Sequence, residues 1–168
     1  MFNKGDKIFY GQTGVCVVEE ISEKVLTKNL KRRYYTLKPM YQQNNIIYAP
    51  VESDKVFMRE IISTDDAENL IKNVPEIYNK VLNGEEKSDY QEYVESHSCE
   101  KLLELAVILY SKKQSAKRMK KKLGFIDEKY LKRAEELLFG ELAAVLEIAP
   151  EQVPERLFAE IRQKNKKS

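Results

Sequence analysis

The sequence has few of the residues from which enzymes and metal sites are built. Its 168 residues include one histidine, two cysteines and no tryptophan. One histidine and two distant cysteines cannot close a zinc site on their own. A catalytic triad needs a histidine oriented by a carboxylate, and the sequence around Ser96-His97 does not identify one. We therefore expect no enzymatic activity, no bound metal and no cofactor.

Other absences limit where the protein is expected to work. No stretch approaches the roughly 18 consecutive apolar residues of a membrane-spanning helix, and residues 1–4 do not begin a signal-peptide pattern. Cys16 and Cys99 are the only cysteines, so we expect both to be reduced and structural. These features predict a cytoplasmic protein without a membrane partner.

The net charge of +2 hides an uneven distribution along the chain. Residues 1–60 carry +3, residues 61–111 carry −7, residues 112–133 carry +8 and residues 134–168 carry −2. A uniform charge near zero would argue against a nucleic-acid partner, but a segregated block of +8 does not.

The first 60 residues have the pattern of short strands separated by turns. Strand patterns cover residues 7–10, 15–21, 33–37 and 46–49, and residues 56–62 offer a fifth. Five strands of this spacing predict a small half-open barrel. Of the adjacent Tyr34 and Tyr35, one should face the core and the other the solvent, because strand side chains alternate.

The pattern changes to helices near residue 63. Residues 64–66 offer an N-cap for a first helix, and residues 72–89 are either a hinge or a packed connector. Ser98 can cap a helix whose residues 102–110 are apolar nearly all round, as in a buried helix. The sequence thus predicts an α+β protein, with a barrel module at 1–62 and an all-helical module at 63–168.

Two helix boundaries are predicted further along the chain. We expect the buried helix to continue through Met119 and to stop at Gly124, since glycine commonly ends helices. Asp127 is then the expected cap of the next helix.

The strongest candidate site is the basic block at residues 112–133. Its ten basic side chains, on two successive helices, predict one positive surface of the kind that phosphate contacts need. They are Lys112, Lys113, Lys117, Arg118, Lys120, Lys121, Lys122, Lys129, Lys132 and Arg133. If the first helix persists, four lysines share a face: Lys113, Lys117, Lys120 and Lys121. A solvated or internally paired helix surface is the alternative.

Several motifs resemble a known family. The opening Phe2-x-x-Gly5-Asp6-x-x-x-Tyr10 and the later Ala49-Pro50-Val51 are similar to the N-terminal module of the CarD family of bacterial transcription regulators. Transcription–repair coupling factors share that module. The run at 134–143, which ends in Gly-Glu-Leu-Ala, resembles a later helix of the family. The resemblance implies a Tudor-like half-open barrel followed by a helical domain.

The resemblance also implies partners and contact positions. The barrel should bind the β subunit of RNA polymerase, and the helical module should bind promoter DNA and modulate open-complex stability. The polymerase contacts carry over to Lys24, Ile46, Ile47 and Tyr48. The family's tryptophan wedge has no counterpart in this chain, and Tyr90 is the nearest candidate by position.

Two other functions remain open at this point. One is a polymerase-docked protein adaptor that does not contact DNA, and the other is an RNA-binding accessory protein. Salt dependence separates the first from a DNA-binding regulator, since several phosphate contacts give a steep slope. In each case we expect a monomer in solution.

Overall fold

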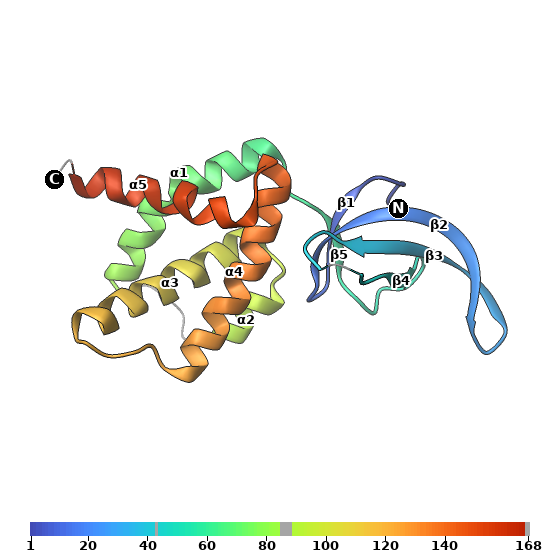
Figure 1. The fold of residues 1–168 in the computed structure, drawn as a ribbon, viewed down its shortest axis with the longest axis horizontal. Coiled ribbons are helices and arrows are strands. Elements are labelled where there is room, and N and C mark those ends of the chain that lie inside the picture. Colours follow the sequence, from blue (N-terminus) through green and yellow to red (C-terminus); the bar gives the residue numbers. More distant parts are fainter. Residues whose placement is uncertain (43, 85–88, 167–168) are drawn as a thin grey trace. The chain divides into compact units, whose positions relative to one another are not determined.

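The computed structural model describes residues 1–42, 44–84 and 89–166. The chain divides by packing into two compact units, Met1–Ile61 and Ile62–Ser168. Figure 1 shows the first as strands and the second as helices. The predicted α+β fold class is therefore confirmed. What each module binds stays a prediction.

The first unit is a five-stranded antiparallel sheet with the strand order β4-β3-β2-β1-β5. The strands are β1 (Lys7–Tyr10), β2 (Gly14–Thr27), β3 (Leu30–Pro39), β4 (Ile47–Pro50) and β5 (Met58–Glu60). β2 and β3 reach further into their hairpin than the sequence predicted. They can do so because Lys28 and Asn29 both adopt left-handed backbone, with φ of 49° and 55°, as in the tight turns that suit twisted strands.

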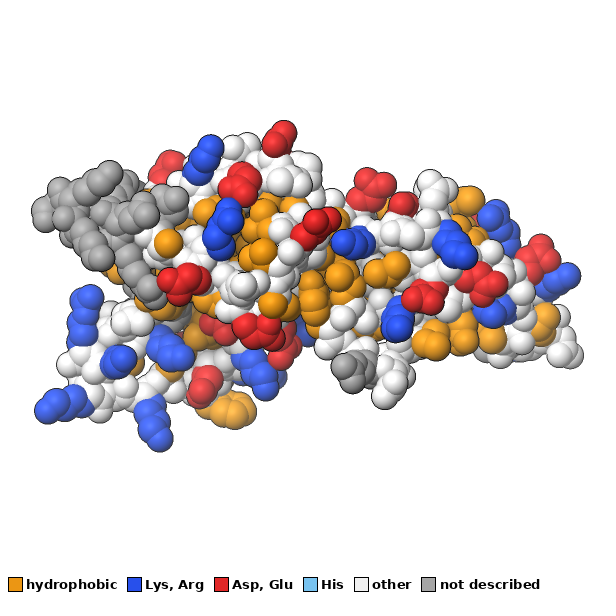
Figure 2. Space-filling model, turned by 45° about the horizontal axis from the view of Figure 1, so that its top comes forward, with side chains coloured by type: hydrophobic (Ala, Val, Ile, Leu, Met, Phe, Trp, Pro, Cys, Tyr) orange, Lys and Arg blue, Asp and Glu red, His pale blue; other side chains and the backbone are white. Residues whose placement is uncertain are grey.

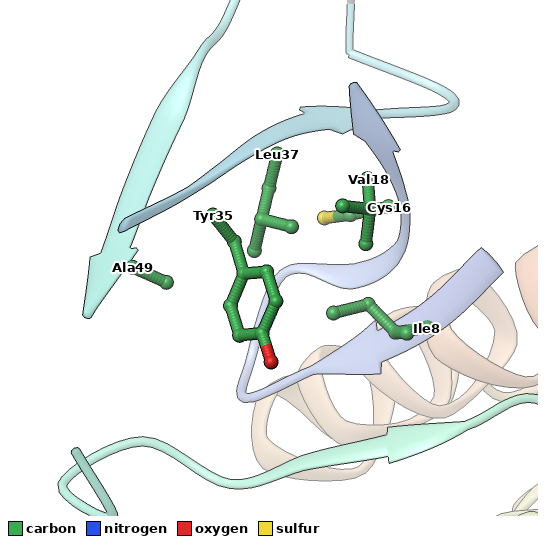
Figure 3. Close-up of a cluster of buried hydrophobic side chains, with 6 residues drawn as sticks. All are labelled: Ile8, Cys16, Val18, Tyr35, Leu37 and Ala49. Carbon is green, nitrogen blue, oxygen red and sulfur yellow. The ribbon is translucent and has the colours of Figure 1, made fainter. Parts of the chain in front are cut away.

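The core of the sheet unit lies on one face of the strands. Figure 3 shows six buried side chains pointing toward one another: Ile8, Cys16, Val18, Tyr35, Leu37 and Ala49. Tyr35 also anchors the start of the chain, because its hydroxyl accepts a hydrogen bond from the Phe2 amide at 3.1 Å. The two rings lie 5.8 Å apart between centroids. The motif residue Phe2 therefore has a structural role.

Gly11 fixes the position of the chain just before β5. Its amide donates to the Phe57 carbonyl at 2.7 Å. A Cβ atom at this position would lie 2.6 Å from Val56 Cγ1, so Val56 or the turn would have to shift. The left-handed φ of 43° at Gly11 also favours glycine.

The second unit contains five α-helices and one short 3₁₀ turn among the described residues. They are α1 (Thr64–Leu82), α2 (Tyr90–Glu95), α3 (Cys99–Arg118), α4 (Phe125–Leu146), η1 (Pro150–Gln152) and α5 (Val153–Lys166). The first cap is Ser63, whose hydroxyl accepts from the Asp66 amide at 3.1 Å. The predicted cap at 64–66 was therefore placed slightly late. The predicted Ser98 cap is confirmed, with the Lys101 amide as donor at 3.3 Å.

The segment at 72–89 is mostly helix. α1 runs to Leu82 with Pro75 inside it, and Figure 1 shows that this helix bends. Proline explains the bend, since it removes one helical hydrogen bond and its ring crowds the preceding turn. The turn that follows begins at Asn83 and Gly84; residues 85–88 lie outside the described residues. The short helix α2 was not predicted.

The helical unit has a core made mostly of leucine and alanine. α3 packs against α4, and α1 packs against both α3 and α5. Residues 102–103 and 105–109 of α3 are buried, which confirms the predicted buried helix. Glu141 of α4 is also fully buried, and its Oε2 atom accepts a hydrogen bond from the Ile62 amide at 3.0 Å. The carboxylate thus holds the start of this unit to α4.

Candidate functional site

Lys24 and Tyr48 lie on the outer face of the sheet, opposite the core. They belong to β2 and β4, which are separated by β3. The Lys24 Nζ atom nevertheless lies 5.2 Å from the centre of the Tyr48 ring, within cation–π range. Two residues that the resemblance suggested separately are therefore brought together by the fold.

The Lys24–Tyr48 contact explains the burial of a tyrosine on the same face. In the strand register Lys24 is paired with Arg32 and Tyr48 with Thr36, so Tyr34 lies between those partners on β3. Tyr34 is 5% exposed and Tyr35 is 2% exposed. The prediction that one of the two tyrosines faces the solvent was therefore wrong. Alternation does place them on opposite faces, but neighbouring strands cover both.

Two hydroxyl groups on this outer face lack a hydrogen-bond partner among the described residues. They are Ser22 Oγ, opposite Tyr34 in the register, and Thr36 Oγ1, opposite Tyr48. Such buried polar atoms are uncommon, because each has lost its contact with water. Both oxygens are fully covered by neighbouring side chains, so they add to the cost of burying this face and are not open to a partner.

The other two predicted polymerase-contacting residues differ in orientation. Ile46 is 59% exposed and lies just before β4 rather than within it. Ile47 is half-buried and packs against the sheet core. Its side chain therefore faces away from Tyr48, which is 44% exposed. β4 is an edge strand of the sheet, so its outer backbone groups are open to pairing.

The first of the two helices that carry the basic block ends earlier than the sequence predicted. α3 ends at Arg118 with Met119 as its C-cap, and Gly124 is the N-cap of α4. Lys120 stops the helix with left-handed backbone, φ 56°. The Lys121 amide then donates to the Ala116 carbonyl at 2.8 Å, as in a Schellman cap, where glycine is the usual residue.

Three predictions about this region are corrected by that ending. Lys120 and Lys121 are not helical, so they do not share a helix face with Lys113 and Lys117. Gly124 begins a helix rather than ending one. Asp127 lies in the first turn of α4 and is not its cap.

The basic side chains gather around the end of the α3–α4 hairpin. Figure 2 shows lysine and arginine concentrated at the lower left of the helical unit. Nine of the ten predicted residues are exposed, and Arg133 is half-buried, 3.9 Å from Glu136. Burial raises the pKa of Glu135, and the positive charge of Lys113 opposes this. The other exposed lysine and arginine side chains of the basic block do not have this buried carboxyl beside them, so their charges are more accessible to a partner.

Three apolar side chains lie exposed within this basic region. Met119 is 65% exposed, Phe125 83% and Ile126 64%. We call residues 117–126, which carry five basic and these three apolar side chains, the α3–α4 tip. Sequence reasoning missed the apolar part. It placed Met119 on a continuing helix, and it assigned no role to Phe125, which lies between the predicted stop at Gly124 and the predicted cap at Asp127. The ending of α3 at Arg118 shows that Met119 lies outside the helix and its core.

Tyr90, the candidate wedge, is held in a small aromatic cluster. It is half-buried, Lys112 Nζ donates to its hydroxyl, and that Nζ lies 5.0 Å from its ring centre. The Tyr130 ring lies edge-on at 5.5 Å, and the Tyr130 hydroxyl donates to Gln91 Oε1 at 2.8 Å. The structure thus brings together Tyr90 and Lys112. It leaves Tyr90 less free to move than the exposed apolar residues of the tip.

Neither a metal cluster nor a membrane segment is found in the part of the chain that the structure describes. Across residues 1–42, 44–84 and 89–166, no three His, Cys, Asp or Glu side chains are arranged to hold a metal ion. Within the same ranges, every helix is too short or too polar to cross a membrane. Burial raises the pKa of Cys16 to about 11, which keeps that thiol protonated near neutral pH.

Comparison with known families identifies the sheet unit. Residues 2–62 match the family model of the CarD-like/TRCF RID domain. The sheet unit is similar to this domain. The resemblance stated from the sequence is confirmed for these residues, and the match supports a transcription-related protein with RNA polymerase as a partner. No curated protein matches the chain.

Proposed function

We propose that this protein is a non-enzymatic, cytoplasmic transcription regulator. Its sheet unit binds the β subunit of RNA polymerase, and its basic helical end binds promoter DNA and modulates open-complex stability. The observation that carries the proposal is the RID match at residues 2–62, combined with the segregated basic end of the helical unit.

The polymerase-binding surface in this proposal is the outer face around Lys24 and Tyr48. Tyrosine suits such an interface because its ring adds apolar area while its hydroxyl remains available for hydrogen bonding. Tyr48 is 44% exposed and braced by Lys24, so little side-chain freedom is lost on binding. Ile46 extends the apolar area at the sheet edge, and Ile47 supports it from the core side.

The DNA-binding surface in this proposal is the α3–α4 tip with the exposed lysines of both flanking helices. Within the described residues, none of the five basic side chains of the tip forms an ion pair. Their charges are therefore available for phosphate groups, whose neutralisation releases counterions. Because the contacts are mostly with the backbone, they require no particular sequence.

A pull-down with purified bacterial RNA polymerase tests the docking half of the proposal. The full chain should retain polymerase through its β subunit, and Lys24→Glu with Tyr48→Ala should lower retention about tenfold or more. Lys72→Glu, an exposed reversal on α1, is the matched control and should bind as the wild type does. Polymerase binding that survives the double variant would contradict the assigned face.

Salt dependence on forked promoter DNA tests the other half. Affinity should fall steeply between about 50 and 200 mM salt, since several phosphate contacts are made. A flat salt profile would favour the protein-adaptor function instead. A preference for single-stranded RNA over forked DNA would favour the RNA-binding function.

A further inference from the structure

A groove runs between α1 and the N-terminal half of α3. Its volume is about 730 Å³, within the range of sites that hold ligands or side chains. α1 lines it with one helical stripe of residues: Asp66, Leu70, Asn73, Ile77 and Val81. Spanning 15 residues at 1.5 Å each, this stripe is about 22 Å long. The groove is thus long enough for a loop or about four helical turns.

The groove has an apolar floor and an acidic rim. Leu70, Ile77 and Val81 are half-buried side chains that line it from α1. The charged lining residues are Asp66, Glu76, Glu100, Glu104, Lys80 and Lys101. Lys80 pairs with Glu76 at 3.8 Å and Lys101 with Glu104 at 3.6 Å, so these two acids are already neutralised. Asp66 and Glu100 leave the rim with a net charge of −2. An occupant should therefore combine apolar side chains with positive charge.

The α3–α4 tip has that combination. Phe125, Met119 and Ile126 are its exposed apolar side chains, and five basic residues accompany them: Lys117, Arg118, Lys120, Lys121 and Lys122. Burying a phenylalanine that is 83% exposed in water would be favourable. The tip is thus chemically complementary to the groove in both apolar character and charge.

The tip and the groove of one chain cannot meet. Both are attached to α3, where the groove lining ends at Ile108 and the tip begins at Lys117. Nine residues of rigid helix hold these positions about 13 Å apart. Only the tip of another copy can reach the groove.

We propose that the α3–α4 tip of one copy docks into the α1–α3 groove of a second copy. Two different surfaces of the same chain then meet, so the association is head to tail and need not close into a dimer. The contact involves one loop and is favoured at low salt and high concentration. The monomer that the sequence predicts is then the form of the protein at low concentration.

The proposal also has a consequence for nucleic acid, which rests on the proposed function. The tip is the proposed DNA-binding surface, so a tip seated in a groove is withdrawn from DNA. DNA and self-association should therefore compete, each weakening the other by the same factor.

Sedimentation equilibrium of the full chain at low and high salt is the deciding experiment. The average mass should rise above 19.7 kDa with concentration at low salt, and this rise should disappear at high salt. Lys121→Glu with Lys122→Glu in the tip, or Glu100→Lys with Glu104→Lys in the groove, should each weaken association about tenfold or more. The matched control is Asp54→Lys with Lys55→Glu, which reverses two exposed charges in the sheet unit.

A mixture of the two variants separates docking from general charge effects. The reversed tip should fit the reversed groove, so an equimolar mixture should regain association that neither variant shows alone. At concentrations too low for self-association the groove variant should bind DNA as the wild type does, and at higher concentrations it should bind DNA more tightly, which keeps this test separate from the proposed function. A constant mass of 19.7 kDa at every concentration, or no recovery in the mixture, would overturn the proposal.

Discussion

The two candidate surfaces of this protein are built in different ways. The Lys24–Tyr48 face lies on paired strands, where each side chain is fixed by its neighbours across the sheet. The α3–α4 tip lies on a loop and a helix start, and Met119, Phe125 and Ile126 within it are at least 64% exposed. Under the proposed function, we expect the first surface to recognise its partner by shape and the second to recognise its partner by charge, with the salt sensitivity that charge brings.

The two units that carry these surfaces also differ in the size of their hydrophobic cores. Among the described residues, the sheet unit has nine buried hydrophobic side chains, whereas the helical unit has 23. A unit of about 60 residues buries a smaller fraction of its surface and has little stability in reserve. The Lys24–Tyr48 face therefore belongs to the unit that we expect to be the less stable of the two.

Core truncation should show the largest difference between the units. Leu37→Ala in the sheet and Leu138→Ala in α4 remove fully buried side chains, and each should cost about 2–5 kcal/mol. Urea unfolding should show the sheet unit lost at lower denaturant in Leu37→Ala, together with polymerase binding. Leu82→Ala, at a residue 59% exposed, is the control. If both units of Leu37→Ala unfolded at the same urea concentration, the inference that the sheet unit is the less stable would be wrong.

Removing the buried carboxylate of Glu141 should have the next largest effect. Glu141→Ala leaves the Ile62 amide without this acceptor, which should lower the free energy of unfolding by about 1–3 kcal/mol. Glu141→Gln keeps an oxygen acceptor and should recover part of that loss. Chemical denaturation of both variants measures the difference, and equal stabilities would show that the bond contributes little.

Charge reversal at Lys117 and Lys121 should weaken DNA binding at low salt by about tenfold or more, because each lysine is expected to neutralise a phosphate. The slope of affinity against salt should also become shallower by about two. Fluorescence anisotropy with forked DNA measures both quantities. Unchanged binding would remove the basic tip from the proposed function and leave only the strand-built surface.

The contact between Lys24 and Tyr48 should give a smaller effect. A double-mutant cycle with Lys24→Ala and Tyr48→Phe should give little coupling, since the ring remains. The cycle with Tyr48→Ala should give about 0.5–1 kcal/mol. Unfolding measurements on the single and double variants supply these values. Zero coupling with alanine would mean that the sheet face is no more preorganised than the tip.

Alkaline pH should produce the smallest and most local effect. Burial raises the pKa of Cys16 to about 11, and burial with the nearby Cys16 raises that of Tyr10. A raised pKa means that the folded state holds its proton more tightly. This contribution to stability is present below pH 9 and is lost as pH rises toward 11. Urea unfolding at increasing pH should show the sheet unit weakening, and Cys16→Ala should reduce that dependence.

Much of the fold follows from local patterns in the sequence. The alternation in β1 and the β-branched run in β2 predicted their strands, and Ser98 predicted its helix cap, because each signal acts over a few residues. The burial of Tyr34 could not be predicted in this way. It depends on Lys24 and Tyr48 meeting across β3, a contact between residues distant in sequence.

The candidate site was predicted in composition but not in shape. The charge count located the basic residues, but helix continuity placed Lys120 on a helix that ends before it. The ending uses left-handed backbone at a lysine, for which sequence gives little signal because glycine is the usual residue. The exposure of Phe125 was missed because the predicted helix began only at Asp127, whereas α4 begins at Phe125.

The boundary between the units has a consequence for how such chains arise. The Ile61 amide donates to Lys7 in the sheet unit, and the adjacent Ile62 amide donates to Glu141 in the helical unit. Each of these two adjacent amides thus bonds within its own unit. A gene fusion at this point would interrupt neither bond, so the sheet unit could be joined to a different partner domain and keep its structure.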